Sequence, residues 1–112
     1  MAHIVISPVS GRVAVRWRDH VVVDTTRALE LREGSYPPVL YVPREDADMS
    51  FFKPSTRHTT CPWKGEASYF HLRDGEQSVD NAVWSYETPK ADVSAIAGHL
   101  AFYPDKVEIK RA

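Results

Sequence analysis

Apolar and polar side chains alternate along the first part of the chain with a period of two residues. Over residues 12–18, Val13, Val15 and Trp17 fall on one face and three arginines fall on the other. This alternation is typical of a strand with one buried face. A turn at residues 19–20 then favours a β-meander. Three further strands are predicted from β-branched or alternating runs, at residues 21–25, 28–32 and 39–42.

The clearest local signal in the second half is a hairpin. Residues 68–73 and 77–85 alternate in the same way and flank the dipeptide Asp74-Gly75. Such a dipeptide favours a two-residue type I′ turn, in which both central residues have positive φ. The resulting register should bring Tyr69 close to residues 83–84.

Helical signals are short. Proline at position 43 can start one helical turn over residues 43–47. Asp92 can cap a second short helix over residues 92–97, and Gly98 can end it in a left-handed conformation. Frequent prolines leave no room for a long helix.

The fold class follows from this order of elements. Residues 100–103 and 107–110 flank a turn at 104–105 and are expected to form a last hairpin. Many short strands and one or two short helices predict a mainly β fold, either a single small antiparallel sheet or a partly closed barrel. A length of 112 residues with 43% hydrophobic residues fits a single domain over residues 1–112.

Charge and hydropathy exclude several partner classes. Fourteen Lys and Arg against fifteen Asp and Glu leave a net charge of −1, which gives no uniform field to attract nucleic acid or an anionic membrane. The apolar runs are far shorter than the roughly 18–20 residues of a membrane-spanning helix. No secretory signal pattern is present, so we expect a cytoplasmic protein. Exposed strand edges are compatible with a homodimer, which the sequence neither predicts nor excludes.

Cys61 is the single cysteine, so an internal disulfide and a zinc site built from paired cysteines are both excluded. We expect no metal and no cofactor. His58 and Lys64 stand three residues to either side and could favour a thiolate if the loop folds back. Pro62 holds Cys61 in extended geometry, which favours a structural role instead.

Four aromatic residues are candidates for a ligand site: Tyr41, Tyr69, Trp84 and Tyr86. Trp84 and Tyr86 share one face by period two, and the hairpin should add Tyr69 from the partner strand. Aromatic walls with polar tips are usual in small-ligand pockets. The alternative is that these side chains only fill a small core.

Charged residues near these aromatics suggest what the site could recognise. Arg44 and Lys64 could form a charged rim that reads a carboxylate or phosphate, although Arg44 could equally belong to a surface turn. Glu87 is the best isolated acid. The sequence therefore supports a module that binds a small, partly polar molecule or peptide group. The alternative is an enzyme that uses Cys61, Lys64 or Glu87 in the same pocket.

Four motifs together resemble a known family. They are YVPRED at residues 41–46, HTTCPWKGEASY at 58–69, AVWSYE at 82–87 and IAGHLAFYPD at 96–105. In this order they resemble family 427 of the domains of unknown function, over about residues 13–107. Its catalogue label mentions nucleotidyl transfer. That chemistry normally needs a phosphate-binding glycine loop and two metal-binding carboxylates.

The resemblance also implies a β-tent fold, shared with methionine sulfoxide reductase B enzymes and the thalidomide-binding domain of cereblon. Those relatives carry four-cysteine zinc sites, which a chain whose one cysteine is Cys61 cannot build. This chain has no glycine-rich loop, and Asp46 and Asp48 are its nearest approach to a carboxylate pair. The resemblance therefore implies the sheet arrangement without the metal.

Overall fold

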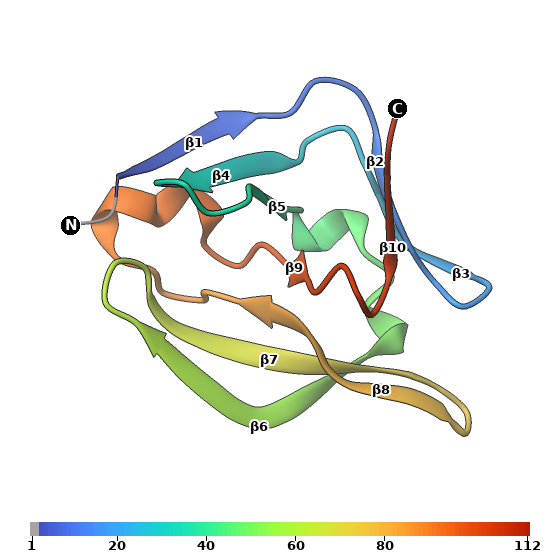
Figure 1. Cartoon of the computed structure of the whole chain (residues 1–112). Coiled ribbons are helices and arrows are strands. Elements are labelled where there is room, and N and C mark those ends of the chain that lie inside the picture. Colours follow the sequence, from blue (N-terminus) through green and yellow to red (C-terminus); the bar gives the residue numbers. More distant parts are fainter. Residues whose placement is uncertain (1–2) are drawn as a thin grey trace.

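A computed structural model describes residues 3–112; residues 1 and 2, which the single-domain prediction includes, lie outside the described residues. The described part contains ten strands and three short 3-10 helices (Figure 1). The strands are β1 (Ile4–Pro8), β2 (Val13–Trp17), β3 (His20–Thr25), β4 (Leu29–Glu33), β5 (Val39–Tyr41), β6 (Phe52–Cys61), β7 (Gly65–Asp74), β8 (Gln77–Ser85), β9 (Ala101–Phe102) and β10 (Glu108–Arg111). The 3-10 helices are η1 (Arg44–Asp46), η2 (Met49–Phe51) and η3 (Ala91–Ile96).

The predicted mainly β class is confirmed, but the strands form three antiparallel sheets instead of one. Their orders are β1-β4-β5, β10-β2-β3 and β6-β7-β8-β9. In Figure 1 the sheet of β6, β7 and β8 lies below that of β1 and β4, and β2 and β10 stand at one side. A bridge between Val42 and Leu100 joins the lower and upper sheets through two backbone hydrogen bonds of 2.9 and 2.8 Å.

The alternation over β2 has the expected effect on burial. Val13, Val15 and Trp17 are buried, and Arg16 between them is exposed. They belong to a large apolar cluster that also contains Leu72 and Leu100. A second, smaller cluster lies between β4, β5, β7 and η3. It consists of Leu31, Tyr41, Ala67, Tyr69, Tyr86, Val93, Ile96 and Ala101.

The hairpin of β7 and β8 is confirmed, including the register that sets Tyr69 opposite Trp84. Its turn type differs from the prediction. Asp74 pairs with Gln77, so the central residues are Gly75 and Glu76. Gly75 has φ +58°, whereas the only non-glycine residues with positive φ in the described part are Arg18 and Asn81. Positive φ at the first central residue alone is the type II′ pattern.

The predicted last hairpin is wrong. β9 is only two residues long and pairs with β8, and β10 crosses to the free edge of β2, where Glu108 pairs with Arg16. This pairing satisfies the open edge of β2 and packs Ile109 against the larger cluster.

Two of the three short helices lie where the sequence predicted them, but the N-terminal cap of η3 differs from the prediction. η1 lies within the predicted turn over 43–47. η3 begins after Lys90 without a side-chain cap, so Asp92 lies inside its first turn and does not cap it. Gly98, with φ +70°, follows the helix in the left-handed conformation that was expected. η2 was not predicted; Asp48 caps its start, because the Asp48 side chain accepts a hydrogen bond from the Ser50 amide.

The loop between β1 and β2 depends on a glycine. Gly11 has φ +86°, and a Cβ atom there would lie 2.3 Å from the Ala112 carbonyl oxygen. The Ala112 amide is fixed in turn by a 2.9 Å hydrogen bond to the Arg12 carbonyl. The close approach of the two chain segments therefore requires a residue without a side chain.

We expect Gly11→Ala to lower the free energy of unfolding by about 2 kcal/mol, from the strain of positive φ and the displaced backbone. Gly34→Ala is the matched control, because Gly34 has φ +55° with open space around it. That variant should lose only the strain contribution, about 1 kcal/mol. Urea unfolding measures both values, and equal losses would show that the Ala112 contact does not constrain position 11.

Candidate functional site

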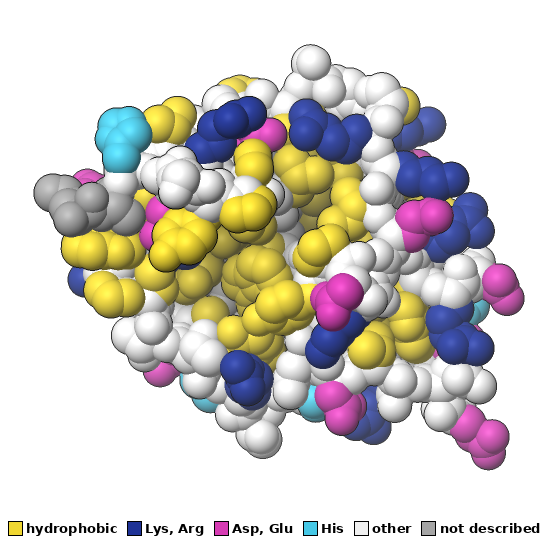
Figure 2. Space-filling model, in the orientation of Figure 1, with side chains coloured by type: hydrophobic (Ala, Val, Ile, Leu, Met, Phe, Trp, Pro, Cys, Tyr) yellow, Lys and Arg dark blue, Asp and Glu magenta, His cyan; other side chains and the backbone are white. Residues whose placement is uncertain are grey.

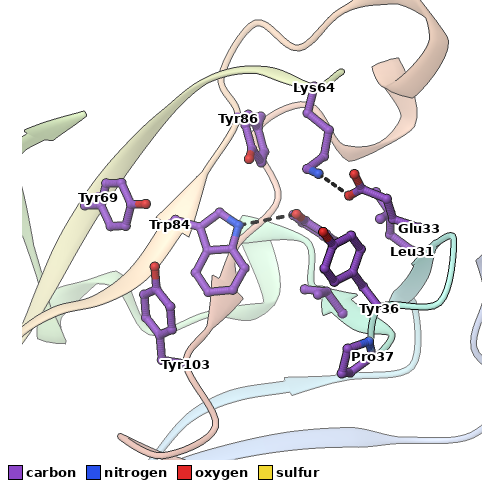
Figure 3. Close-up of a pocket in the computed structure, with 11 residues that line it drawn as sticks. Leu31, Glu33, Tyr36, Pro37, Lys64, Tyr69, Trp84, Tyr86 and Tyr103 are labelled. Atoms are coloured by element: carbon purple, nitrogen blue, oxygen red, sulfur yellow. Dashed lines mark hydrogen bonds and ion pairs between the residues drawn. The ribbon is translucent and has the colours of Figure 1, made fainter. Parts of the chain in front are cut away.

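An open pocket of about 260 Å³ lies between the upper and lower sheets (Figure 3). Most of its walls are aromatic, and two opposite charges meet at one end. The lining residues are Leu31, Glu33, Tyr36, Pro37, Val39, Tyr41, Lys64, Tyr69, Trp84, Tyr86 and Tyr103. Segments distant in sequence therefore build one concave site, as is usual for a small-ligand pocket.

Strand pairing explains why the aromatic side chains converge. Tyr69 and Trp84 are directly opposite on β7 and β8, and Tyr86 follows two residues later on the same face. Tyr103 follows β9, the neighbour of β8, and its ring centre lies 4.7 Å from that of Trp84. From β5, Tyr41 meets Trp84 edge to face and accepts a 3.3 Å hydrogen bond from the indole Nε1.

Lys64 and Glu33 form the polar end of the pocket (Figure 3). The Lys64 Nζ donates to the Glu33 carboxylate at 2.6 Å, and the two side chains are only 11% and 18% exposed. The Lys64 ammonium also lies 6.0 Å from the centre of the Tyr86 ring. An ion pair with this little exposure is screened weakly by water.

Local backbone structure directs Lys64 into the pocket. It is the last residue of the turn between β6 and β7, and Gly65 after it has φ +114°. The Lys64 carbonyl accepts a 2.9 Å hydrogen bond from the Lys90 amide, which fixes the turn against the segment before η3. Glu33 ends β4, beside the loop that carries Tyr36.

The ionisation of the polar end follows from these contacts. Burial by itself lowers the pKa of Lys64, but the hydrogen bond to Glu33 and the negative groups around it outweigh burial, so the pKa is raised. Lys64 is therefore a cation at neutral pH, held by a carboxylate. The pair contributes one positive and one negative charge, so this end of the pocket is neutral overall.

Burial and neighbouring groups also shift the tyrosines. Burial chiefly raises the pKa of Tyr86, and burial together with nearby Tyr69 raises that of Tyr103 to about 12. Tyr69 shows the opposite direction. Burial would raise its pKa, but a 2.9 Å hydrogen bond to Thr59 and the guanidinium of Arg57, 5.0 Å from the ring centre, keep it below the ordinary value. The raised pKa values keep the hydroxyls of Tyr86 and Tyr103 protonated at neutral pH, where they can donate or accept hydrogen bonds.

Five of the eight residues proposed from the sequence line this pocket. They are Tyr41, Lys64, Tyr69, Trp84 and Tyr86. Within residues 3–112 the lining does not include Arg44, Cys61 or Glu87. Cys61 is half-buried and packs against the smaller apolar cluster, so the structure gives it a packing position beside the site.

The sequence suggested that Arg44 forms part of the charged rim, but in the structure Arg44 does not line this pocket. Its guanidinium donates to the buried Ser85 hydroxyl at 3.2 Å and pairs with Glu87 at 2.5 Å. It also lies 5.4 Å from the centre of the Phe70 ring, and its Nε is buried without a hydrogen-bond partner among residues 3–112. Arg44 thus ties η1 to β7 and to the end of β8.

Glu33 is the main site residue that the sequence analysis missed. It stands 31 positions before Lys64 in a different sheet, so no spacing in the sequence relates the two. Tyr36 and Tyr103 were missed as site residues as well. Tyr103 lies within one of the four motifs, and this was the available signal.

Asp46 and Asp48, which the sequence offered as a possible carboxylate pair, have local structural roles. Asp46 accepts a 2.7 Å hydrogen bond from Thr25 and pairs with Arg27, and Asp48 holds Ser50 at the start of η2. Over residues 3–112, no three His, Cys, Asp or Glu side chains lie together in an arrangement that could hold a metal ion. No helix of this part is long and apolar enough to cross a membrane.

Comparison with known proteins identifies the family. A search of the curated proteins finds no match. Residues 5–112 match the family described as "Domain of unknown function (DUF427)". The matched range is longer at both ends than the range of 13–107 expected from the motifs. Because the match spans nearly the whole chain, the protein belongs to the DUF427 family.

Proposed function

We propose that this protein is a binding module for a small, partly polar molecule, which it holds in the aromatic pocket. One observation carries the proposal: a nearly buried ion pair of Lys64 and Glu33 opens into a pocket walled by tyrosines and a tryptophan. A core that only needed to be filled would not place this pair beside an open volume of about 260 Å³.

The chemistry of the walls defines what the site can hold. The Trp84 ring offers a flat apolar surface, and the hydroxyls of Tyr69, Tyr86 and Tyr103 supply donors and acceptors around it. Lys64 has three N–H donors, of which Glu33 occupies one. A ligand with a flat apolar part and a polar group that accepts a hydrogen bond from Lys64 fits this arrangement.

An enzyme remains the second class to be tested, but the structure favours it less. Lys64 lines the pocket together with Glu33, whereas Glu87 is engaged by Arg44. Within the described residues, the lining contains neither Glu87 nor the Cys61 thiol. Of the three groups suggested as alternatives for catalysis, Lys64 is the one that lines the pocket in the described part of the chain.

Benzamide is a suitable first probe, since it combines a flat ring with a small polar group. We expect it to shift the NMR amide signals of residues at the pocket, and Lys64→Met to weaken its binding about tenfold through loss of a charged hydrogen bond. Methionine keeps the unbranched apolar stem of lysine. Lys53→Met is the matched control, because Lys53 is exposed on β6.

Two results would contradict the proposal. One is the absence of any localised shift at millimolar benzamide in the folded wild-type protein. The other is equal affinity of the wild-type, Lys64→Met and Lys53→Met proteins, which would show that the polar end does not take part in binding.

A further inference from the structure

A second pocket, of about 430 Å³, adjoins the first and is almost entirely apolar. It lies between β5, the segment around β9, and β10. The side chains that belong to this pocket and not to the first are Pro38, Leu40, Phe102, Pro104 and Ile109. None of these five carries a polar side-chain atom, so most of the wall of this volume suits an apolar group.

The two pockets share four wall residues, and we refer to them together as the groove. Tyr36, Pro37, Val39 and Trp84 line both of them. Figure 2 shows hydrophobic side chains gathered around a hollow on this face of the molecule, over the region of β5 and β9. Trp84 therefore stands between a polar end, formed by Lys64 and Glu33, and an apolar end near Ile109.

The charge at the polar end selects the head group of a ligand for this groove. The Lys64 Nζ and the Glu33 carboxylate form an ion pair at 2.6 Å, and both side chains are largely buried. An anionic head and a cationic head would each meet one like charge and one opposite charge, held 2.6 Å apart, so the pair gives neither of them a net attraction. Either would also lose its own hydration, which a pair already neutralised does not compensate. An uncharged head that both donates and accepts hydrogen bonds can use Lys64, Glu33 and the tyrosine hydroxyls together.

We propose that the ligand of this groove is an amphiphile, with an uncharged hydrogen-bonding head between Lys64 and Trp84 and an apolar chain that runs past Trp84 into the second pocket. This inference rests on the proposed binding function and specifies its ligand class. It explains why a mostly apolar volume adjoins the polar site along a shared wall.

A series of straight-chain amides tests the chain. Butanamide, hexanamide and octanamide carry the same head, and burial of the added methylenes in the second pocket should tighten binding about tenfold for each two-carbon step. Titration by NMR gives the affinities and maps the contacts, at concentrations below those at which the amides aggregate. Shifts at residues of the second pocket, near Leu40 and Ile109, should appear only as the chain lengthens.

A head-group series at constant chain length tests the polar end. Octanamide should bind at least fivefold more tightly than octanoate or octylamine, because each ion meets a like charge and loses hydration. Equal or tighter binding of either ion would overturn the uncharged head.

Ile109→Thr locates the chain without changing the polar end. Ile109 is half-buried on β10, and threonine keeps a branched side chain that suits a strand. We expect the variant to weaken octanamide at least threefold and to leave benzamide unchanged. Val21→Thr, on the exposed side of β3, should change neither.

The outcomes separate this inference from the function on which it rests. If benzamide and butanamide bind at Lys64 but longer chains bind no better, the amphiphile is wrong and the binding module stands. Loss of chain-length dependence in Val21→Thr as strongly as in Ile109→Thr would also overturn the placement of the chain. If benzamide itself fails to bind, both proposals fail.

Discussion

The protein is expected to lose stability steeply as the pH rises above 10. Tyr41, Tyr86 and Tyr103 have pKa values raised above the ordinary 10.0, chiefly by burial, and the pKa of Lys64 is raised above 10.5 by its partners despite burial. A raised pKa means that the folded state keeps its proton after the unfolded state has lost it. The corresponding stability is complete below pH 10 and is lost as the pH rises toward the folded-state values.

Tyr86 should account for a large share of this loss, because it is only 6% exposed and burial raises its pKa strongly. Each pH unit between the unfolded and folded pKa of one such group is worth about 1.4 kcal/mol. Tyr69 acts in the opposite direction, since its pKa is lowered, and offsets part of the loss.

Urea unfolding of Tyr86→Phe between pH 7 and 12 measures this contribution. We expect the variant to match the wild-type protein at pH 7 within about 1 kcal/mol and to lose stability less steeply above pH 10, by about 1.4 kcal/mol per pH unit. Tyr36→Phe is the control, because the Tyr36 side chain is 72% exposed. Parallel curves for the wild-type and Tyr86→Phe proteins would show that the Tyr86 hydroxyl ionises as freely in the folded state as in the unfolded state.

Arg44→Ala is expected to destabilise the fold by about 3 kcal/mol, because it removes charged hydrogen bonds and leaves the Ser85 hydroxyl buried without its partner. This reverses the expectation from sequence, in which a rim charge would matter for ligand affinity and little for folding. Since Arg44 lies outside the lining within the described residues, the variant that still folds should bind benzamide as the wild-type protein does.

Two comparisons make this prediction sharp. Arg44→Lys keeps the charge but cannot reach Ser85 and Glu87 with one planar group, so it should recover only part of the loss. Arg12→Ala breaks a 2.9 Å pair with Asp24 in which both side chains are at least half exposed, and should cost less than about 1 kcal/mol. If Arg44→Ala lowers the free energy of unfolding no more than Arg12→Ala does, Arg44 behaves as an ordinary exposed charge and does not hold η1 to β7 and β8.

The aromatic wall could be predicted because its geometry is local. A two-residue turn at Gly75 fixes the register of β7 and β8, and period two then places Tyr69, Trp84 and Tyr86 on one side. The same reasoning identified β2 from its alternating valines. Where neighbouring residues in sequence determine the geometry, pattern and propensity suffice.

The polar end could not be predicted, because it joins two sheets. Lys64 leaves a turn and Glu33 ends a strand of another sheet, and each alone resembles an ordinary surface charge. The same holds for Arg44: the sequence suggested a charged rim or a surface turn, but its partners come from the end of β8 and the residues after it. Long-range charge pairing leaves no periodic signal in a sequence.

Three strands were missed or misplaced, namely β1, β6 and β10, and the errors at β6 and β10 have identifiable causes. β6 carries mostly polar, exposed side chains and a proline at position 54, as an edge strand can. It therefore shows no clear alternation and was not predicted. β10 was assigned to a hairpin with its neighbour in sequence, whereas its partner is β2, near the other end of the chain.

The pairing of β10 with β2 has a consequence for the order of folding during synthesis. β2 and β3 can form their hairpin as soon as they leave the ribosome, but the edge of β2 stays open until residues 108–111 have been made. Such a late, long-range closure is slow compared with hairpin formation and leaves an unpaired strand edge exposed in the nascent chain. Chaperone binding to the nascent chain should therefore persist until the last strand emerges.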